Sequence, residues 1–555
     1  MISRAKSSRI ENSAATAAAI IEALLKRKRQ SAQAIRETSR KIAASRRDRI
    51  PPTAALRRAY AAAVARDPSR RRPELDRLLV RRGVRSLSGV AVVTVLTKPY
   101  PCPGRCVYCP TDARMPKSYL PDEPAAARAL GHRFDPFRQT AWRLMALAAN
   151  GHPTDKVELI VKGGTWSSYP WDYQRWFIKR CFDACNAFGR SGSRAARTLA
   201  AAQSRNENAQ ARIIGLTLET RPDRITPTEI VRLRDLGCTR VELGVQSVDD
   251  RILAAVKRGH DTAAVVRAAS SLRAAGFKTD FHLMPQLPGA TPSSDLAEIE
   301  EIFSNPDYRP DMIKIYPCTV VPQAELYGWW KAGRYTPYPD DELVEMLIAA
   351  KSRHVPRWCR ISRLIRDIPS NNIVAGNAMT NLRETVQREM KKRGLTCRCL
   401  RCREIGHAAK TAPHLHRARP RLFDDSYEAS GGTEHFLSFE DRSRRAIFAF
   451  CRLRLPPQPP DAEIAALLPE IDGAAFVREL HTYGQLVPIA GRTARASQHT
   501  GLGRRLLAEA ERLAAAAGFR RLAVIAGVGV RPYYRKLGYR LVGTYMVKKL
   551  EKRKN

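Results

Sequence analysis

Six short runs rich in β-forming residues recur between residues 89 and 395, and a segment long enough for a helix separates each run from the next. These runs are 90–97, 157–161, 213–220, 240–244, 279–283 and 312–315. Strands that alternate with helices form a parallel sheet through right-handed crossovers. We therefore expect an α/β fold whose main part, residues 89–395, is an incomplete TIM-type barrel with its functional groups at the carboxyl ends of the strands.

A cysteine-rich loop follows the first of these runs. Cys102, Cys106 and Cys109 have C-x3-C-x2-C spacing, with Tyr108 beside the last cysteine. Three thiolates at this spacing can hold three irons of a four-iron cluster and leave the fourth open to S-adenosylmethionine, whose reductive cleavage releases a 5′-deoxyadenosyl radical. A zinc knuckle is the alternative, but zinc sites usually pair two cysteine groups. We therefore expect a 4Fe-4S cluster here.

Glycines and polar groups end several of the other runs. They are Gly163, Gly164, Glu219, Arg221, Glu242, Gln246, Lys314 and Tyr316. In a barrel of this kind the carboxyl ends of parallel strands meet at one mouth, so these groups are expected to gather there. An ordinary tight turn at the glycines and a simple ion pair between Glu219 and Arg221 remain the alternatives. We take Lys314 as a catalytic candidate.

The chain is strongly basic, and the excess is uneven. Lys and Arg number 96 against 54 Asp and Glu, a net charge of +42, and residues 1–100 hold 24 basic and 7 acidic side chains. Such a field favours a polyanionic partner. Nucleic acid is preferred to a membrane because the sequence has no run of about 18 apolar residues and no signal-peptide core. Twelve cysteines are too few for a disulfide scaffold of this size, and their clustering at metal-ligand spacing fits a reducing cytoplasm best.

Residues 1–88 are rich in Ala, Arg and Ser, with helical apolar spacing at 18–25 and 56–64 and a break at 50–53. We expect helices with cationic surfaces that contact RNA or DNA. A merely solvated charged surface and an organelle transit peptide are the alternatives.

A second cysteine cluster lies in residues 396–425. Cys397, Cys399 and Cys402 are followed by His407, His414 and His416. Three thiolates and one imidazole satisfy tetrahedral zinc, and we choose His407 as the fourth ligand. Free thiols are the alternative. A zinc ion here would join the barrel to the domain that follows.

Residues 426–555 contain further β-rich runs at 446–455, 475–480 and 522–526. A glycine-rich turn with Gln498, Gly501 and Gly503 opens an amphipathic segment at 506–517. Bare amide N–H groups at the start of a helix bind a pyrophosphate. The turn resembles the acetyl-CoA loop of GNAT acetyltransferases, and the segment 530–539 resembles that family's closing segment. We therefore expect a GNAT domain in 426–555, with Tyr533 and Tyr534 as catalytic candidates.

Taken together, these motifs resemble the catalytic subunit of Elongator over nearly the whole chain. The matching stretches are 99–110, 155–158, 163–165, 218–223, 243–247, 366–369, 431–432 and 478–484. The resemblance implies a tRNA-modifying enzyme that builds a carboxymethyl group, or its precursor, on C5 of the wobble uridine, with acetyl-CoA as the source of two carbons. The partner is then the anticodon stem-loop of tRNA, whose target base must be unstacked.

The resemblance also assigns an acetyl-CoA site. The matching residues are Lys156, Glu479, Leu480, His481, Thr482, Ser497, Gln498, His499 and Tyr534. A lysine can meet a CoA phosphate, and a tyrosine hydroxyl can orient a thioester or protonate the departing thiol. Lys156 belongs to the barrel, so this assignment requires the two domains to face each other across one cavity.

The chain departs from eukaryotic members in its shorter cysteine gap and in His435, where a second aromatic is common. These features suggest a bacterial or archaeal member that acts without accessory subunits. Two other functions are weighed. A protein lysine acetyltransferase would use the barrel as a scaffold, but an acidic groove would suit it better than this cationic chain. A non-catalytic RNA-binding protein would have no use for three cluster cysteines and an acetyl-CoA loop.

Overall fold

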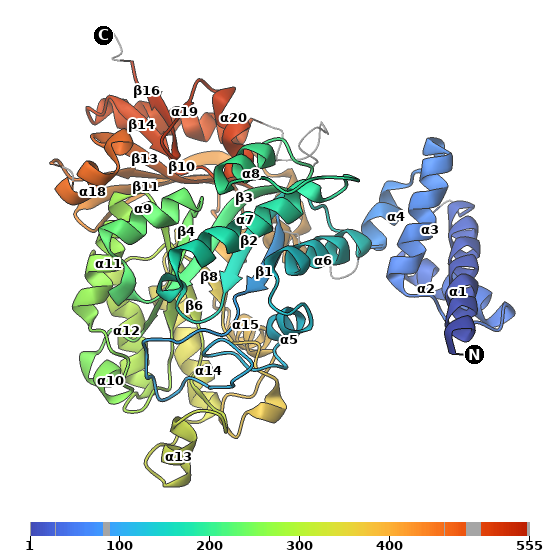
Figure 1. Ribbon diagram of the computed structural model, residues 1–555, viewed down its shortest axis with the longest axis horizontal. Helices are drawn as coiled ribbons and strands as arrows, with labels where there is room; N and C mark the ends of the chain where they lie inside the picture. Colours follow the sequence, from blue (N-terminus) through green and yellow to red (C-terminus); the bar gives the residue numbers. More distant parts are fainter. Residues whose placement is uncertain (1, 28, 81–88, 460, 484–500, 552–555) are drawn as a thin grey trace.

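The computed structural model describes the whole chain except residues 1, 28, 81–88, 460, 484–500 and 552–555. Three parts follow one another: a group of amino-terminal helices, a large parallel sheet wrapped by helices, and a second sheet set against one end of the first (Figure 1). Among the described residues, none of the helices combines the length and the apolarity that a membrane crossing requires.

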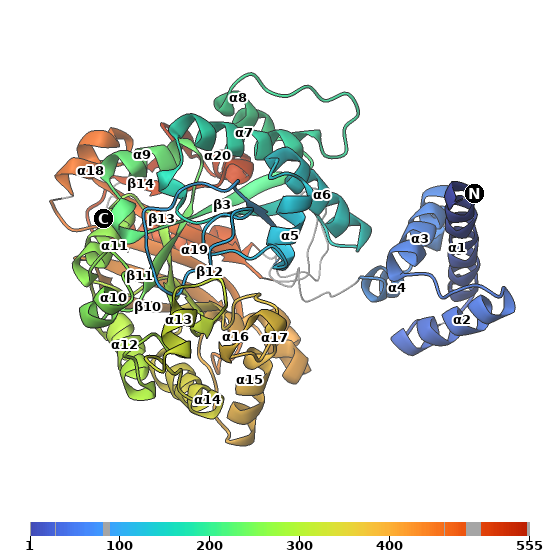
Figure 2. The ribbon, with the colours of Figure 1, turned by 60° about the horizontal axis from the view of Figure 1, so that its bottom comes forward.

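The amino-terminal helices form a small bundle with its own core. Its helices are α1 (Ile2–Leu25), α2 (Ala32–Ser45), α3 (Thr53–Arg66) and α4 (Pro73–Leu78). Ile20, Leu24, Leu56 and Tyr60 are buried together between α1 and α3. Proline is disfavoured inside a helix, and α3 begins directly after Pro52, as the predicted break required. The bundle lies beside the rest of the molecule, nearest α6 (Pro136–Ala149), in both views (Figures 1 and 2).

The large sheet has seven parallel strands that curl into a half-barrel, which confirms the predicted fold. Their order is that of the sequence: β1 (Ala91–Leu96), β2 (Lys156–Lys162), β3 (Arg212–Thr220), β4 (Arg240–Gln246), β5 (Lys278–Leu283), β6 (Met312–Ile315) and β8 (Arg360–Arg363). The first six coincide with the six predicted runs, and β8 was not predicted.

Helices cover the outer side of this sheet. They include α5 (Pro124–Gly131), α6, α7 (Trp171–Ala187), α8 (Leu199–Asn206), α9 (Pro227–Asp235), α10 (Asp250–Ala255), α11 (Thr262–Ala274), α12 (Pro292–Ser304), α14 (Asp340–Ala349) and α15 (Leu382–Lys392). Because successive side chains of a strand point to opposite sides, β2 buries Val157, Leu159 and Val161 in the core. Lys156 and Lys162, on the other side of β2, line the interior of the half-barrel.

Short elements complete the barrel part and lead on to the second sheet. β7 (Thr319–Val320), which pairs with β9 (Ala375–Gly376), and α13 (Leu326–Lys331) belong to the barrel part, and α16 (Leu400–Arg403) and α17 (Ile405–Thr411) lead to the second sheet. Leu400 and Ile405 are buried in the core of the second sheet. The connection is therefore packed against the domain that it leads to.

The second sheet is mixed, with the order β10-β11-β12-β13-β14-β16-β15. Its elements are β10 (Arg421–Ala429), β11 (Gly432–Glu440), β12 (Ile447–Leu455), α18 (Ala462–Leu467), β13 (Ala474–Thr482), α19 (Leu502–Ala516), β14 (Arg521–Val524), α20 (Arg531–Arg535), β15 (Arg540–Val542) and β16 (Tyr545–Lys549). Among its described strands only β13 and β14 run parallel. β10 begins before residue 426, where we expected this domain to start.

The second sheet covers the amino ends of the barrel strands. The Arg478 guanidinium of β13 lies 2.6 Å from the Asp311 carboxylate, just before β6, and donates to the Phe277 carbonyl at 2.8 Å, just before β5. The Tyr545 hydroxyl of β16 donates to the Ala275 carbonyl at 2.8 Å. Burial raises the pKa of Asp311, but Arg478 and Arg452 more than offset it and hold the pKa below its usual range. A buried ion pair therefore fixes the two sheets end to end.

Candidate active site between the two sheets

A cavity of about 1940 Å³ extends from the cysteine loop, through the interior of the half-barrel, to the second sheet. Thirteen of the residues predicted for the two sites line it together: Cys102, Cys106, Cys109, Lys156, Lys314, Glu479, Leu480, His481, Thr482, Gly501, Gly503, Tyr533 and Tyr534. The assignment of Lys156 to the acetyl-CoA site requires the two domains to face each other across one cavity, and groups from both domains do line this cavity. Ser497, Gln498 and His499 lie outside the described residues.

The cysteine loop forms the end of the cavity near the carboxyl ends of the barrel strands. Cys106 is buried, and the Arg258 guanidinium lies 3.4 Å from its sulfur. A hydrogen bond with Cys109 lowers the pKa of the Cys106 thiol to about 4, with a further contribution from Arg258 and against the effect of burial. A Cβ at Gly104 would meet the end of the Arg221 side chain, so the loop passes close to this arginine. These thiols fit an iron cluster, because thiolates are its ligands.

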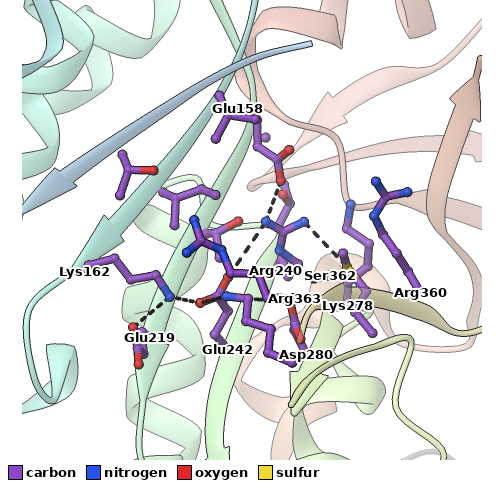
Figure 3. A pocket seen from close by; sticks show the side chains of 18 of the residues that line it. Glu158, Lys162, Glu219, Arg240, Glu242, Lys278, Asp280, Arg360, Ser362 and Arg363 are labelled. Atoms are coloured by element: carbon purple, nitrogen blue, oxygen red, sulfur yellow. Dashed lines mark hydrogen bonds and ion pairs between the residues drawn. The ribbon is translucent and has the colours of Figure 1, made fainter. Parts of the chain in front are cut away.

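A dense ionic network lies deeper in the half-barrel (Figure 3). Glu242 of β4 is fully buried and pairs with both Lys162 of β2 and Lys314 of β6. His282 of β5 joins it, with ring nitrogens 3.2 Å from Glu242 and 3.3 Å from Glu219. Although burial opposes ionisation, Lys162 and Lys314 hold the pKa of Glu242 well below its usual range. The carboxylate is therefore the charged centre of the network.

Lys314 differs from its neighbour Lys162. Burial lowers the pKa of Lys314 to about 8, despite the attraction of Glu242. Lys162 experiences the same burial, but Glu219 and Glu242 both pair with it, and together they raise its pKa well above the usual range. Lys314 is therefore the ammonium group in this network that can lose its proton most easily, which suits a group that transfers protons.

Further ion pairs continue the network to the second sheet. Arg240 of β4 pairs with Glu158 of β2 at 2.5 Å. Lys278 of β5 lies 3.2 Å from Glu479 of β13, and Arg452 of β12 lies 3.0 Å from the same carboxylate. Against the effect of burial, Lys278 and Arg452 lower the pKa of Glu479 to about 2. Polar groups thus line the cavity from one predicted site to the other.

The start of α19 forms the other end of the cavity. Gly501 is its N-cap, in the left-handed region at φ 76°, and a Cβ at Gly501 would meet nothing within 4 Å. A Cβ at Gly503 would stand 3.4 Å from both the Thr482 and the Tyr533 hydroxyls. The amides of this first turn are therefore open to the cavity, as the binding of a pyrophosphate requires.

The two neighbouring tyrosines of α20 are placed differently. The Tyr533 side chain is 42% exposed and its hydroxyl approaches Gly503, whereas Tyr534 is only 5% exposed and packs on Tyr539 with ring centroids 5.8 Å apart. Burial raises the pKa of Tyr534 well above its usual range. Both tyrosines line the cavity, and Tyr533 presents its hydroxyl nearer to the opening of α19.

The second cysteine group lies apart from this cavity. The sulfur atoms of Cys397, Cys399 and Cys402 lie within 4.8 Å of one another, and Lys351 donates to Cys397 at 3.4 Å. Three converging thiols fit a zinc ion. His407 is not in this group: its Nε2 lies 3.8 Å from Glu404, and the residue lines the large cavity. The fourth ligand that we chose is therefore not brought to the three sulfurs.

Several residues of the site were not predicted, namely Glu158, Lys162, Arg240, Arg258, Lys278 and His282. A signal for most of them is present in the sequence. Charged or polar residues occupy every second position of β5, at Lys278, Asp280 and His282, within a strand between two helices. Parallel strands are normally apolar on both sides, so polar alternation marks a strand that faces a polar interior.

Comparison with known proteins gives consistent matches. The radical SAM superfamily matches residues 100–301, and its C-terminal domain matches residues 310–392. A tRNA uridine(34) acetyltransferase of Methanocaldococcus infernus is 45% identical over 482 residues, which cover 85% of this chain and 88% of the relative. Elongator complex protein 3 of Homo sapiens is 39% identical over 503 residues, 88% of this chain and 89% of the relative. The solved structure of archaeal Elp3 from Methanocaldococcus infernus, with an N-terminal deletion, has a TM-score of 0.71 at 43% identity and covers 84% of this chain and 100% of that chain.

Proposed function

Because this chain belongs to the radical SAM superfamily, and within it to the family of Elongator complex protein 3 and the tRNA uridine(34) acetyltransferases, we propose that it modifies the wobble uridine of tRNA. The product is a carboxymethyl group, or its precursor, on C5 of that base, and acetyl-CoA supplies the two carbons. The partner is the anticodon stem-loop of cytoplasmic tRNA, and the chain acts without accessory subunits.

One observation carries this proposal: a single cavity is lined by the cluster cysteines at one end and by the opening of α19 at the other. With water as the acyl acceptor, acetate released when acetyl-CoA is hydrolysed at Gly501 and Gly503 can therefore reach the cysteine loop without leaving the protein. Two unrelated activities on one chain would not need a shared cavity.

The residues of the acyl end bind and activate acetyl-CoA. The amides at Gly501 and Gly503 hold the pyrophosphate, helped by the dipole of α19. Tyr533 donates its hydroxyl proton to the departing sulfur, because its oxygen lies nearest the turn. Lys156, whose pKa is lowered by burial, lines the same cavity and is the group that the resemblance assigns to a CoA phosphate.

The residues of the other end organise the radical step. Cys102, Cys106 and Cys109 would hold the iron cluster, and with S-adenosylmethionine it would supply a radical that removes hydrogen from the acetyl methyl group. Arg258 fixes Cys106, and Glu219 offers a carboxylate near the carboxyl end of β3. Lys314 holds or releases a proton at its Nζ near neutral pH.

The proposal is tested with anaerobically purified protein, S-adenosylmethionine, acetyl-CoA and tRNA, with the mass of the wobble nucleoside as the readout. Cys106→Ala should lose iron and S-adenosylmethionine cleavage while tRNA affinity stays nearly unchanged. Gly501→Glu should keep iron but lose acetyl-CoA binding, since it sets a carboxylate against the pyrophosphate. Full cleavage by the first variant, or unaltered acetyl-CoA affinity of the second, would contradict the respective site.

A further inference from the structure

Four aromatic rings form a continuous stack that starts beside the cysteine loop and ends on α7. The ring centroids of Tyr100 and Tyr169 are 4.8 Å apart, those of Tyr169 and Tyr173 5.2 Å, and those of Tyr173 and Trp176 5.6 Å. The angles between successive ring planes are 29°, 22° and 34°. Tyr100 stands two residues before Cys102, so the stack connects the outer surface of the barrel with the mouth of the site.

Hydrogen bonds hold the middle of this stack in place. The Tyr169 hydroxyl donates to the Lys98 carbonyl at 2.7 Å and lies 2.7 Å from the Thr97 hydroxyl. The Lys98 amide donates to the Tyr173 hydroxyl at 3.1 Å. Both rings are thus fixed to the segment that leaves β1, and they give the two outer rings a rigid support.

The two ends of the stack are open to solvent. Tyr100 is 37% exposed and Trp176 is 44% exposed. Trp142 and Met145 of the adjacent α6 are exposed as well, at 44% and 56%. Four large apolar side chains exposed on neighbouring elements are more than the single exposed residues usual on a monomer, and they point to a binding surface.

The surroundings of the stack are cationic. The Lys98 ammonium lies 5.0 Å from the Tyr173 ring centroid. Helix α7 carries Arg175, Lys179 and Arg180 against Asp172 and Asp183, and the sequence of α6 has two arginines and no acidic residue. Aromatic rings among cations are suited to single-stranded nucleic acid, because bases stack on the rings while the cations contact phosphates.

The location supports the same partner. Helix α6 packs against α7 and also contacts α3 of the basic bundle. Figures 1 and 2 place the bundle next to α6 from two directions. The stack therefore lies on the side of the barrel where α6 meets the basic bundle, within reach of an RNA that the bundle binds.

We propose that Tyr100 and Trp176 are the outer rings of a stacking platform for unpaired RNA bases. The inference rests on the proposed function, since it takes the RNA to be the tRNA anticodon loop. Stacking on an aromatic ring tolerates any base, so the platform holds loop nucleotides without reading their sequence. It would keep the neighbours of the target uridine in place while that base enters the site.

The test is the affinity of the full-length protein for a labelled anticodon stem-loop, measured by fluorescence anisotropy over a series of salt concentrations. Trp176→Ala and Tyr100→Ala should each weaken binding by roughly 5- to 100-fold, the range found for loss of one stacked base. Trp176→Phe and Tyr100→Phe keep a ring and should stay within about three-fold of the unsubstituted protein. Leu541→Ala removes an equally exposed apolar side chain on β15 and should have no effect.

The salt dependence separates stacking from charge. The two alanine variants should keep the slope of log K against log salt, whereas Arg175→Ala should reduce its magnitude by about 0.7–0.9 if it loses one phosphate contact. Tyr100 is close to the cysteine loop, so the iron content of Tyr100→Ala is measured as a control. Trp176 lies on α7, so the result for Trp176→Ala does not depend on an intact iron site.

Alanine variants that both bind within about two-fold of the unsubstituted protein would overturn the platform. Equal losses for the alanine and phenylalanine variants would also overturn it, because the rings would then not act by stacking. In either case tRNA binding and modification by the unsubstituted protein would persist, and only this inference would fail. An unsubstituted protein that does not bind the stem-loop would contradict the proposed function itself.

Discussion

The barrel interior and the amino-terminal bundle both carry many charges, but they hold them in opposite ways. In the interior, Glu242 is fully buried and shared between two lysines, and the pKa values of all three groups are shifted. In the bundle, Arg70 and Glu22 pair with side chains 28% and 45% exposed.

The difference indicates two uses of charge. Buried charges interact strongly because little solvent screens them, so their positions must be fixed by several partners. Exposed charges are screened over about 8–10 Å, so each contributes little and many are needed to attract a polyanion. The interior is therefore suited to placing small groups in defined protonation states, and the bundle is suited to a long polyanion.

The largest contrast is expected from removing one carboxylate in each region. Glu242→Gln leaves the ammonium groups of Lys162 and Lys314 buried without their shared counter-charge, which should destabilise the protein by about 3–5 kcal/mol. Glu22→Gln removes the exposed partner of Arg70 and should leave stability unchanged within error. Chemical denaturation of both variants at neutral pH measures the contrast.

A Glu242→Gln variant as stable as the parent would show that the interior charges are solvated after all. A large loss from Glu22→Gln would show that the bundle, too, depends on fixed pairs. Either result would remove the distinction between the two regions.

The second prediction concerns the number of charges. Deleting residues 1–88 should weaken tRNA binding roughly uniformly across tRNA sequences and flatten its salt dependence, because each lost phosphate contact removes about 0.7–0.9 from the slope of log K against log salt. The measurement is tRNA affinity over a salt series for several tRNAs.

Acetyl-CoA binding and iron content serve as controls for this deletion, and both should survive because the bundle has a core separate from those of the two sheets. Since acetyl-CoA opening is expected to need bound tRNA, tRNA-stimulated hydrolysis should be lost. An unchanged affinity and slope would place the RNA path elsewhere.

The sequence predicted the strands of the barrel better than those of the second sheet, where, of the strands described, only β12, β13 and β14 match predicted runs. Six of the seven barrel strands coincide with runs of β-forming residues. The seventh, β8, reads Arg-Ile-Ser-Arg and has no such run, so only its pairing with β6 makes it a strand. Strand β10 was missed because its alternating side chains are mostly exposed and polar, and it resembles a loop in composition.

The site, too, was predicted only where its residues form a local sequence pattern. Cysteine spacing and the glycine turn are local patterns, and their residues line the cavity. The network around Glu242 joins side chains from five strands, and which of them meet depends on register, with shifts between Val157 and Glu158 and between Leu243 and Gln246. The contact between His282 and Glu242 therefore depends on strand pairing and cannot be predicted from a local sequence pattern.

The smallest effect concerns Asp295 of α12, a buried acid that is held by a backbone amide and a tyrosine hydroxyl. One of its oxygens accepts from the Gln286 amide at 2.8 Å and from the Tyr338 hydroxyl at 2.7 Å. Burial raises its pKa to about 6, above the unfolded value of 3.8, although these bonds oppose the rise. Between pH 3.8 and about 6 the folded state therefore binds more protons than the unfolded state, and stability falls as pH rises through this window.

Asp295→Asn keeps an oxygen for both bonds but does not titrate, so its stability relative to the parent should increase by up to about 3 kcal/mol from pH 4 to pH 7. Denaturation of both proteins across that range measures the difference, and Asp295→Glu, which retains the titration, is the control. A difference independent of pH would mean that Asp295 is ionised throughout, and burial alone would then not distinguish it from the paired carboxylates of the interior.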